Sequence, residues 1–172
     1  VVGKSVKSTL HSVPDCQAIV KKAIVEKLKE KYDVDWFDET GAEYTVQVAL
    51  LKDMATLTID TSGSGLHKRG YRANALDAPL KETLAAAMVE LSYWNKDRIL
   101  LDPFCGSGTI PIEAALIARN IAPGLNRHFA SEEWERVPES LWKEERRKCY
   151  EAIDYDCMPE IYGSDIDPAA IE

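Results

Sequence analysis

The sequence predicts an α/β protein in which a small α+β domain is followed by the first part of a Rossmann-like domain. The main observation is a branched apolar run at 99–101 that ends at Asp102, then a turn with two glycines and an Ala-rich stretch. This is the strand, turn and helix order of a parallel α/β sheet. Before it, apolar residues alternate at 44–50 and 57–60, which is typical of an antiparallel hairpin. The polar break Thr61–Gly65 separates the two parts, so we predict domains at 1–65 and 66–172.

The composition is that of a globular protein with a hydrophobic core. The 172 residues are 45% hydrophobic and 29% charged. No apolar run is long enough to span a bilayer and the N-terminus has no signal-peptide layout, so we expect a cytoplasmic protein that makes no membrane contact. The four cysteines form no C-x-x-C pair, which argues against a metal site.

Charge is distributed unevenly along the chain, whose net charge is −8. Residues 1–72 carry 11 Lys and Arg against 10 Asp and Glu, whereas residues 73–172 carry 10 against 19. A surface that binds phosphates is therefore expected in the first part.

The first domain is expected to contain one amphipathic helix and two strands. Ser12 is the candidate N-cap of the helix, Pro14 suits its first turn, and Asp15 completes a pattern like a capping box. A turn at Lys52-Asp53 joins the two strands of the hairpin. Because this core is thin, we expect further strands before Val1.

The second domain is expected to begin with a helix that has Asp77 as its cap and Pro79 in its first turn. Its core stripe would be Leu80, Leu84, Ala87, Met88 and Leu91. A second helix is predicted from Thr109 to about Asn120. Residues 123–160 resemble an insertion with one or two short helices, fastened to the domain by tryptophans. The last elements are a strand that ends at Asp165, a cap at Asp167 and a helix from Pro168.

Three basic residues, Lys68, Arg69 and Arg72, lie directly after the polar break, with Tyr71 between them. They could neutralise phosphates of RNA while the tyrosine stacks on a base. Alternatively, the segment is a linker whose arginines pair with nearby carboxylates. The sequence leaves both interpretations open.

The spacing of the glycine turn distinguishes three classes of nucleotide-like ligand. A phosphate-binding P-loop needs a lysine after its second glycine, and none is present. In the dinucleotide fingerprint G-x-G-x-x-G the third small residue lets the helix approach the strand, but here that position is Pro111. The third class is the class I methyltransferase, whose turn starts with an acid at the strand end, as Asp102 does.

Two acids are expected to bind opposite ends of the methyl donor. Asp102 would lie beside its ammonium group, and the backbone of Phe104–Gly108 would pass close to its methionine part. Asp165, at the end of the next strand, would accept hydrogen bonds from the ribose. Asp167 is interpreted as a helix cap, and Cys105 as a packing residue because no basic group is adjacent.

At these residues the chain resembles the bacterial THUMP-domain RNA methyltransferases, which are often labelled N6-adenine-specific DNA methylases. The resemblance rests on DPFCGSGTIPIEAALIARNIAPG with GLHKRGYR, APLKETLAAAM and GSDIDP. It implies an RNA-binding THUMP domain at 1–65, a cofactor, S-adenosylmethionine, and RNA, such as ribosomal RNA, as the partner. The implied cofactor-binding residues are Asp102, Pro103, Phe104, Cys105, Gly106, Ser107, Gly108, Thr109, Asp165, Ile166, Pro79 and Leu80.

The resemblance implies methylation of the exocyclic N2 of a guanine in 23S ribosomal RNA, with the base flipped out of the RNA. The family's catalytic N/D-P-P-F/Y motif is absent, since the chain contains no Pro-Pro pair. We therefore expect a fragment that holds the cofactor motifs and no catalytic residue. Two alternatives remain open at this point, a DNA adenine-N6 methyltransferase and a non-catalytic RNA-binding module, and the oligomeric state is not predicted.

Overall fold

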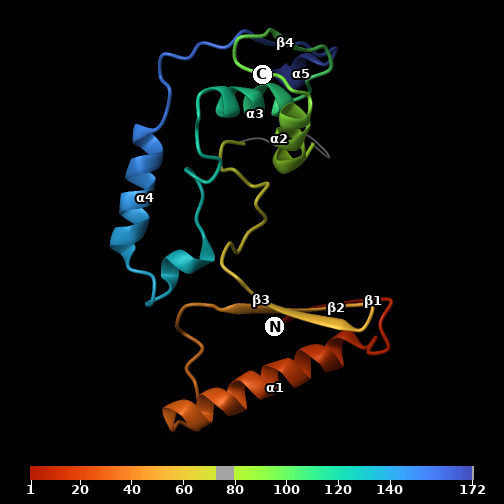
Figure 1. The fold of residues 1–172 in the computed structure, drawn as a ribbon, viewed down its shortest axis with the longest axis vertical. Helices are drawn as coiled ribbons and strands as arrows, with labels where there is room; N and C mark the ends of the chain where they lie inside the picture. The colour runs from red at the N-terminus through yellow and green to blue at the C-terminus, as the bar shows by residue number, and fades with distance from the viewer. Residues whose placement is uncertain (73–79, 172) are drawn as a thin grey trace. The chain divides into compact units, whose positions relative to one another are not determined.

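The computed structural model describes residues 1–72 and 80–171, which form two compact units. The first unit is Val1–Gly63 with Phe129–Pro138, and the second is Ser64–His128 with Glu139–Glu172. Each unit has its own sheet (Figure 1). The units are described separately below.

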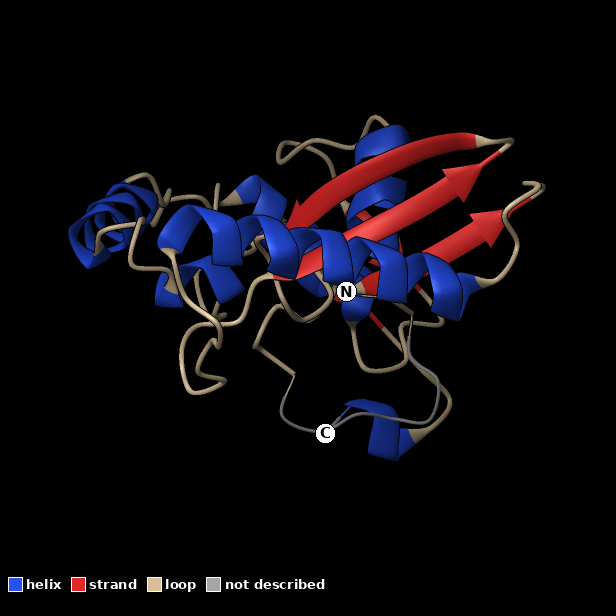
Figure 2. Ribbon diagram, turned by 90° about the horizontal axis from the view of Figure 1, so that it is seen from below, coloured by secondary structure: helices blue, strands red, loops and turns tan. Residues whose placement is uncertain are grey.

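A three-stranded sheet and one long helix make up most of the first unit. The strands are β1 (Val2–Val6), β2 (Thr45–Leu51) and β3 (Met54–Asp60), in the order β1-β2-β3. β1 runs parallel to β2, and β3 runs antiparallel to it. Helix α1 (Val13–Tyr32) lies along one face of the sheet (Figure 2). The buried core of this unit is small and is centred on Val48 and Leu50.

The predicted capping box of α1 is not formed. Ser12 does precede the helix in an extended conformation, but its side chain makes no capping hydrogen bond. The backbone N–H of Cys16 instead donates to the carbonyl of Ser12 at 3.1 Å. The helix ends at Asp33, whose φ of 52° is left-handed and whose N–H donates to the carbonyl of Lys29.

The hairpin turn lies at Lys52-Asp53, as predicted. Both residues have positive φ, 49° and 62°, which is the conformation that matches the twist of a two-residue hairpin. Asp53 also accepts a hydrogen bond from the N–H of Thr9 at 2.6 Å. This bond links the turn to the loop after β1, a strand that the sequence analysis did not predict.

The second unit has a two-stranded parallel sheet of β4 (Leu100–Asp102) and β5 (Ile161–Gly163). Its helices are α2 (Glu82–Leu91), α3 (Thr109–Ala118), α4 (Glu139–Glu151) and the short α5 (Pro168–Ile171). α3 packs against both strands and against α2. The predicted cap Asp77 and Pro79 lie outside the described residues.

The predicted core stripe of α2 is wrong. The residues that α2 buries are Glu82, Ala85 and Val89, and its small residues allow close contact with α3. In the described structure Leu84 and Leu91 are 52% and 77% exposed. Both helical faces carry apolar residues, so periodicity alone did not separate them.

The insertion contains the 3-10 helix η1 (Ala130–Glu133) and α4. Trp134, directly after η1, anchors this part of the insertion to residues of the first unit. Its ring stacks on Tyr44 with centroids 4.7 Å apart, and its Nε1 donates to the carbonyl of Glu43 at 3.0 Å. α4 is joined to the second unit by Arg146, which donates to the carbonyl of Leu125 at 2.6 Å.

Among the residues that the structure describes, no helix is both long and apolar enough to cross a membrane.

Candidate cofactor site

The candidate site lies at the carboxyl ends of β4 and β5, where the glycine turn begins. Register pairs Asp102 with Gly163, so both strands end at the same edge of the sheet. Ser164 donates its N–H to the carbonyl of Asp102, and Cys105 donates its own to the carbonyl of Ser164, each at 2.9 Å. The turn that follows β4 is therefore joined by backbone bonds to the end of β5.

The turn between β4 and α3 has the conformation for which glycine is suited. Gly106 and Gly108 have φ of 52° and 74°. Gly108 is the N-cap of α3, and its N–H donates to the carbonyl of Cys105 at 2.9 Å. This arrangement places the first N–H groups of α3 at the sheet edge, where a helix N-terminus favours anionic ligand groups.

The two acids that the sequence singled out both lie at this edge. Asp102 Oδ1 accepts the N–H of Phe104 at 3.2 Å. Asp165 Oδ2 accepts the N–H of Gly106 at 2.8 Å, and its Oδ1 accepts that of Asp167 at 3.0 Å. Asp165, which lies two residues after the end of β5, is thus hydrogen-bonded directly to the glycine turn after β4.

These backbone bonds also set the charge of Asp165. The N–H of Asp167, and next that of Gly106, lower the pKa of its carboxyl below the ordinary value. The group is therefore a carboxylate at neutral pH and acts only as a hydrogen-bond acceptor. Each of its oxygens has a second lone pair with which it can accept a ligand hydroxyl.

Cys105 is half-buried inside the turn. Burial first, and the negative charges of Asp102 and Asp165 next, raise the pKa of its thiol. A Cβ at Gly163 would lie only 3.0 Å from the Cys105 sulfur, so the side chain fills the space between the turn and β5. A protonated thiol in this position is a packing group and not a nucleophile.

The remaining predicted cofactor residues differ in exposure. Phe104 and Ile166 are 85% and 98% exposed and follow the ends of β4 and β5. Ser107 is half-buried and Thr109, the first residue of α3, is buried, while Pro103 is exposed. Leu80 is half-buried and lies two residues before α2. Pro79, which was predicted with it, lies outside the described residues.

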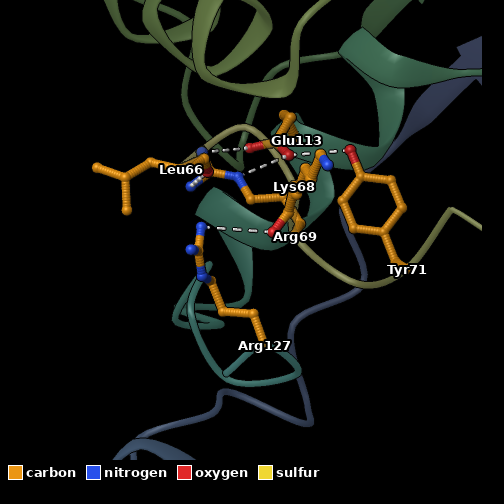
Figure 3. A network of polar contacts seen from close by, with 6 residues as sticks. All are labelled: Leu66, Lys68, Arg69, Tyr71, Glu113 and Arg127. Atoms are coloured by element: carbon orange, nitrogen blue, oxygen red, sulfur yellow. Dashed lines mark hydrogen bonds and ion pairs between the residues drawn. The ribbon is translucent and has the colours of Figure 1, made fainter. Parts of the chain in front are cut away.

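The basic segment, residues 66–72, contacts α3 through the buried carboxylate of Glu113 (Figure 3) and α2 through that of Glu82. Arg69 Nη2 lies 3.3 Å from Glu113 Oε2, and the hydroxyl of Tyr71 donates to Glu113 Oε1 at 2.9 Å. Arg72 Nε lies 3.4 Å from Glu82 Oε1. The arginine side chains are only 11% and 16% exposed. The structure therefore favours the interpretation that Arg69 and Arg72 pair with carboxylates over the interpretation that they contact RNA.

Lys68 differs from the two arginines because its residue is exposed. Its carbonyl accepts a hydrogen bond from Arg127, which also donates to the carbonyl of Gly65 at 3.0 Å. The backbone of the segment is thus held by Arg127 (Figure 3), and for Lys68 no ion pair is found among the described residues. Lys68 stays a predicted RNA contact.

Sequence reasoning missed Glu113 and Glu82 as partners of the arginines. Glu113 is 2% exposed and is surrounded by apolar residues along α3. A single charge in an otherwise apolar helix is the signal that could have indicated a buried ion pair, because burying an unpaired carboxylate is costly. Burial, followed by the hydrogen bond to Glu113, also raises the pKa of the Tyr71 hydroxyl well above its ordinary value.

Among the described residues, no group of three or more His, Cys, Asp or Glu is placed to hold a metal ion.

Comparison with family models supports a two-part chain. The model described as "RMKL-like, methyltransferase domain" matches residues 69–172, and the THUMP domain model matches residues 1–60.

Two similar proteins are named as methyltransferases. YpsC of Bacillus subtilis (strain 168), named as a candidate RNA methyltransferase, is 60% identical over 100% of this chain and 45% of its own length. Ribosomal RNA large subunit methyltransferase K/L of Shewanella baltica (strain OS155) is 43% identical over 86% of this chain and 22% of its own length. The chain thus spans less than half the length of these relatives.

Solved structures of similar proteins have the same fold. A predicted N6-adenine-specific DNA methylase of Listeria monocytogenes matches with a TM-score of 0.93 and 58% identity, over 98% of this chain and 45% of that one. SMU.472, a methyltransferase candidate complexed with SAH, matches with a TM-score of 0.90 and 48% identity, over 99% and 45%.

Proposed function

The chain belongs to the RMKL-like methyltransferase family, and from this we propose that it binds S-adenosylmethionine at the turn between β4 and α3. The observation that carries the proposal is the meeting of Asp102, the glycine turn and Asp165 at one sheet edge. The similar structure of SMU.472 was obtained with SAH, the demethylated product of this donor, which supports the same ligand class.

The residues at this edge fit the proposed ligand. The donor has a cationic amino group, a carboxylate, a ribose and an adenine. Asp102 offers a carboxylate to the ammonium, and the N–H groups at the start of α3 offer donors to the carboxylate. Asp165 offers acceptors to the ribose hydroxyls. Beside these polar groups, Phe104 and Ile166 present exposed apolar surface that the base can cover.

In the proposed reaction, this chain binds and orients the methyl donor. When bound, the donor supplies a methyl group on a positively charged sulfur. The two carboxylates and the turn fix its two ends, which sets the direction of that methyl group. No residue of this chain is assigned to the step that activates the acceptor, because the N/D-P-P-F/Y motif is not among its 172 residues.

For the substrate we propose RNA, and more finely the exocyclic N2 of a guanine in 23S ribosomal RNA. A THUMP domain model matches residues 1–60, and a relative is named for ribosomal RNA of the large subunit. The choice of guanine N2 rests on the family resemblance of the motifs. Methylation of DNA adenine is the second candidate, favoured by the name of the Listeria protein. A non-catalytic RNA-binding module is the third.

The donor site is tested by calorimetry on the full-length protein with S-adenosylhomocysteine. Asp165→Ala should weaken binding by about tenfold, or ~1.4 kcal/mol, because the turn loses its tether and the ribose its acceptor. Asp97→Ala is the matched control, since it removes one exposed carboxylate of the same unit away from the turn. Equal affinities of the two variants would remove Asp165 from the site.

The substrate is tested by methyl transfer from labelled donor with the full-length protein. Ribosomal RNA and duplex DNA are compared at equal nucleotide concentration, and the labelled nucleoside is identified after digestion. We expect label in N2-methylguanosine. Label in DNA adenine alone would favour the second candidate. Binding of RNA without transfer to either acceptor would favour the third.

A further inference from the structure

Arg72 bridges the first residues of two helices in the second unit. Its Nε lies 3.4 Å from Oε1 of Glu82, the first residue of α2. Its Nη2 donates to Oγ1 of Thr109, the first residue of α3, at 2.7 Å. Glu82 and Thr109 are 6% and 4% exposed, so both contacts lie in the interior of the unit.

Both helix starts carry residues of the proposed donor site. The turn 105–109 leads directly into α3, and Leu80 lies two residues before α2. The placement of these two helix starts relative to one another therefore determines the shape of the site. We propose that Arg72 is a positioning residue for the methyl-donor site, holding the starts of α2 and α3 together. This inference rests on the proposed function.

The chemistry of the arginine side chain suits such a bridge. A guanidinium has five N–H donors in a rigid plane, so it can contact a carboxylate and a hydroxyl in different directions at once. A lysine ammonium has the same charge but no fixed plane, and it cannot hold both partners in one geometry. Arg72→Lys thus removes the bridge and retains the charge.

Helix stability alone does not account for a cation at this place. The N-terminus of a helix carries partial positive charge, so a cation there is unfavourable. Glu82 offsets this charge at α2, but Thr109 is a neutral partner at α3. An apolar contact between the two helices would avoid both the repulsion and the burial of charge. The arrangement instead fixes the relative position of the two helix starts, because Arg72 contacts both of them at once.

Arg69 provides the internal comparison. It also forms a buried ion pair with α3, but its partner Glu113 lies one turn further along the helix than Thr109. Arg69 therefore holds the segment 64–72 to the middle of α3, not to the turn. Its side chain is buried to a similar degree, 11% exposed against 16% for Arg72.

The test measures affinity for S-adenosylhomocysteine by calorimetry on the full-length protein, with urea unfolding of each variant. Arg72→Lys should weaken binding by about tenfold. Arg69→Lys is the matched control. It should lower the free energy of unfolding by a similar amount but change the affinity less than twofold. Thr109→Val removes the hydroxyl that accepts the hydrogen bond from Arg72. The double variant should bind no more weakly than the weaker-binding single variant, because both substitutions remove the same contact between Arg72 and Thr109.

Three outcomes separate the hypotheses. If Arg72→Lys weakens binding no more than Arg69→Lys, the positioning role is wrong. If the effects of Arg72→Lys and Thr109→Val add fully, the two residues act independently and the bridge is also wrong. If the wild-type protein itself does not bind S-adenosylhomocysteine, the proposed function fails, which is a different result from loss in one variant.

Discussion

Gly70 shows how a single residue fixes the path of the basic segment. Its φ is 89°, and a Cβ at this position would lie 2.3 Å from the carbonyl oxygen of Asn126. Backbone cannot move aside as a flexible side chain can, so both the conformation and the space require glycine. The segment is thereby held in the path that brings Arg69 and Arg72 to their carboxylates.

Gly70→Ala is expected to lower the free energy of unfolding by about 2 kcal/mol or more, from the left-handed backbone and the clash together. Urea unfolding of the full-length protein measures this change. Gly41→Ala is the control, because the space around Gly41 is open and its φ is not left-handed. It should change stability by less than about 0.5 kcal/mol. A loss at Gly70 no larger than this would contradict the close packing against Asn126.

Tyr71 contributes a hydrogen bond to a buried carboxylate. Tyr71→Phe removes the bond to Glu113 and should cost about 1.5–3 kcal/mol at pH 7. Burial and this bond raise the pKa of Tyr71 above its ordinary value of 10.0, so the folded protein retains the proton longer than the unfolded chain. The contribution is therefore fully present below pH 10 and is lost as pH rises further. Unfolding of both proteins at pH 7 to 11 checks this. A difference that grew above pH 10 would contradict it.

At the scale of elements, Trp134 anchors the segment 129–138 to residues of the first unit. Trp134→Phe keeps an aromatic ring against Tyr44 but loses the Nε1–H bond to the carbonyl of Glu43, so we expect a loss of about 1 kcal/mol. Trp134→Ala should cost more, because the stacked pair adds roughly 0.5–1.5 kcal/mol beyond its buried area. Trp36→Phe is the control at a side chain that is 77% exposed. Equal effects at the two positions would contradict the anchoring role.

The elements that the sequence predicted correctly are those with local signals. Asp102 and the glycines marked the turn between β4 and α3, and Lys52-Asp53 marked the hairpin, because chain direction changes there within a few residues. β1 was missed because its five residues have a glycine and show no strict alternation. The buried face of α2 was assigned wrongly because small residues, Ala85 among them, form its contact with α3.

The candidate site was predictable to the same extent. The end of β4 at Asp102 was predicted from turn chemistry, whereas β5 ends at Gly163, two residues before the predicted Asp165. That both acids follow neighbouring strand ends is a consequence of the parallel pairing of β4 and β5. The pairing of Arg69 with Glu113 joins residues 44 positions apart in the sequence. Such contacts depend on how residues 66–72 pack on α3, and no local sequence pattern predicts that packing. The choice between RNA contact and ion pair therefore needed the structure.

At the scale of the whole molecule, the pairing of the arginines changes which charges are available to RNA. Arg69 and Arg72 are neutralised by Glu113 and Glu82, so of the three predicted contacts only Lys68 presents an exposed cation. RNA binding should then depend on Lys68 through counterion release and not through base recognition. Its effect is expected to be modest and independent of RNA sequence.

Lys68→Gln in the full-length protein should weaken RNA binding at low salt and reduce the slope of log affinity against log salt by about 0.7 to 1, the release of one counterion. Lys96→Gln is the matched control, because Lys96 is exposed but pairs with Asp154 at 3.2 Å. It should leave the salt slope unchanged, since its charge is already compensated. Filter binding or fluorescence anisotropy from 50 to 300 mM salt measures both. An unchanged slope for Lys68→Gln would place the RNA surface elsewhere on the protein, and an equal reduction for both variants would show that net charge alone is responsible.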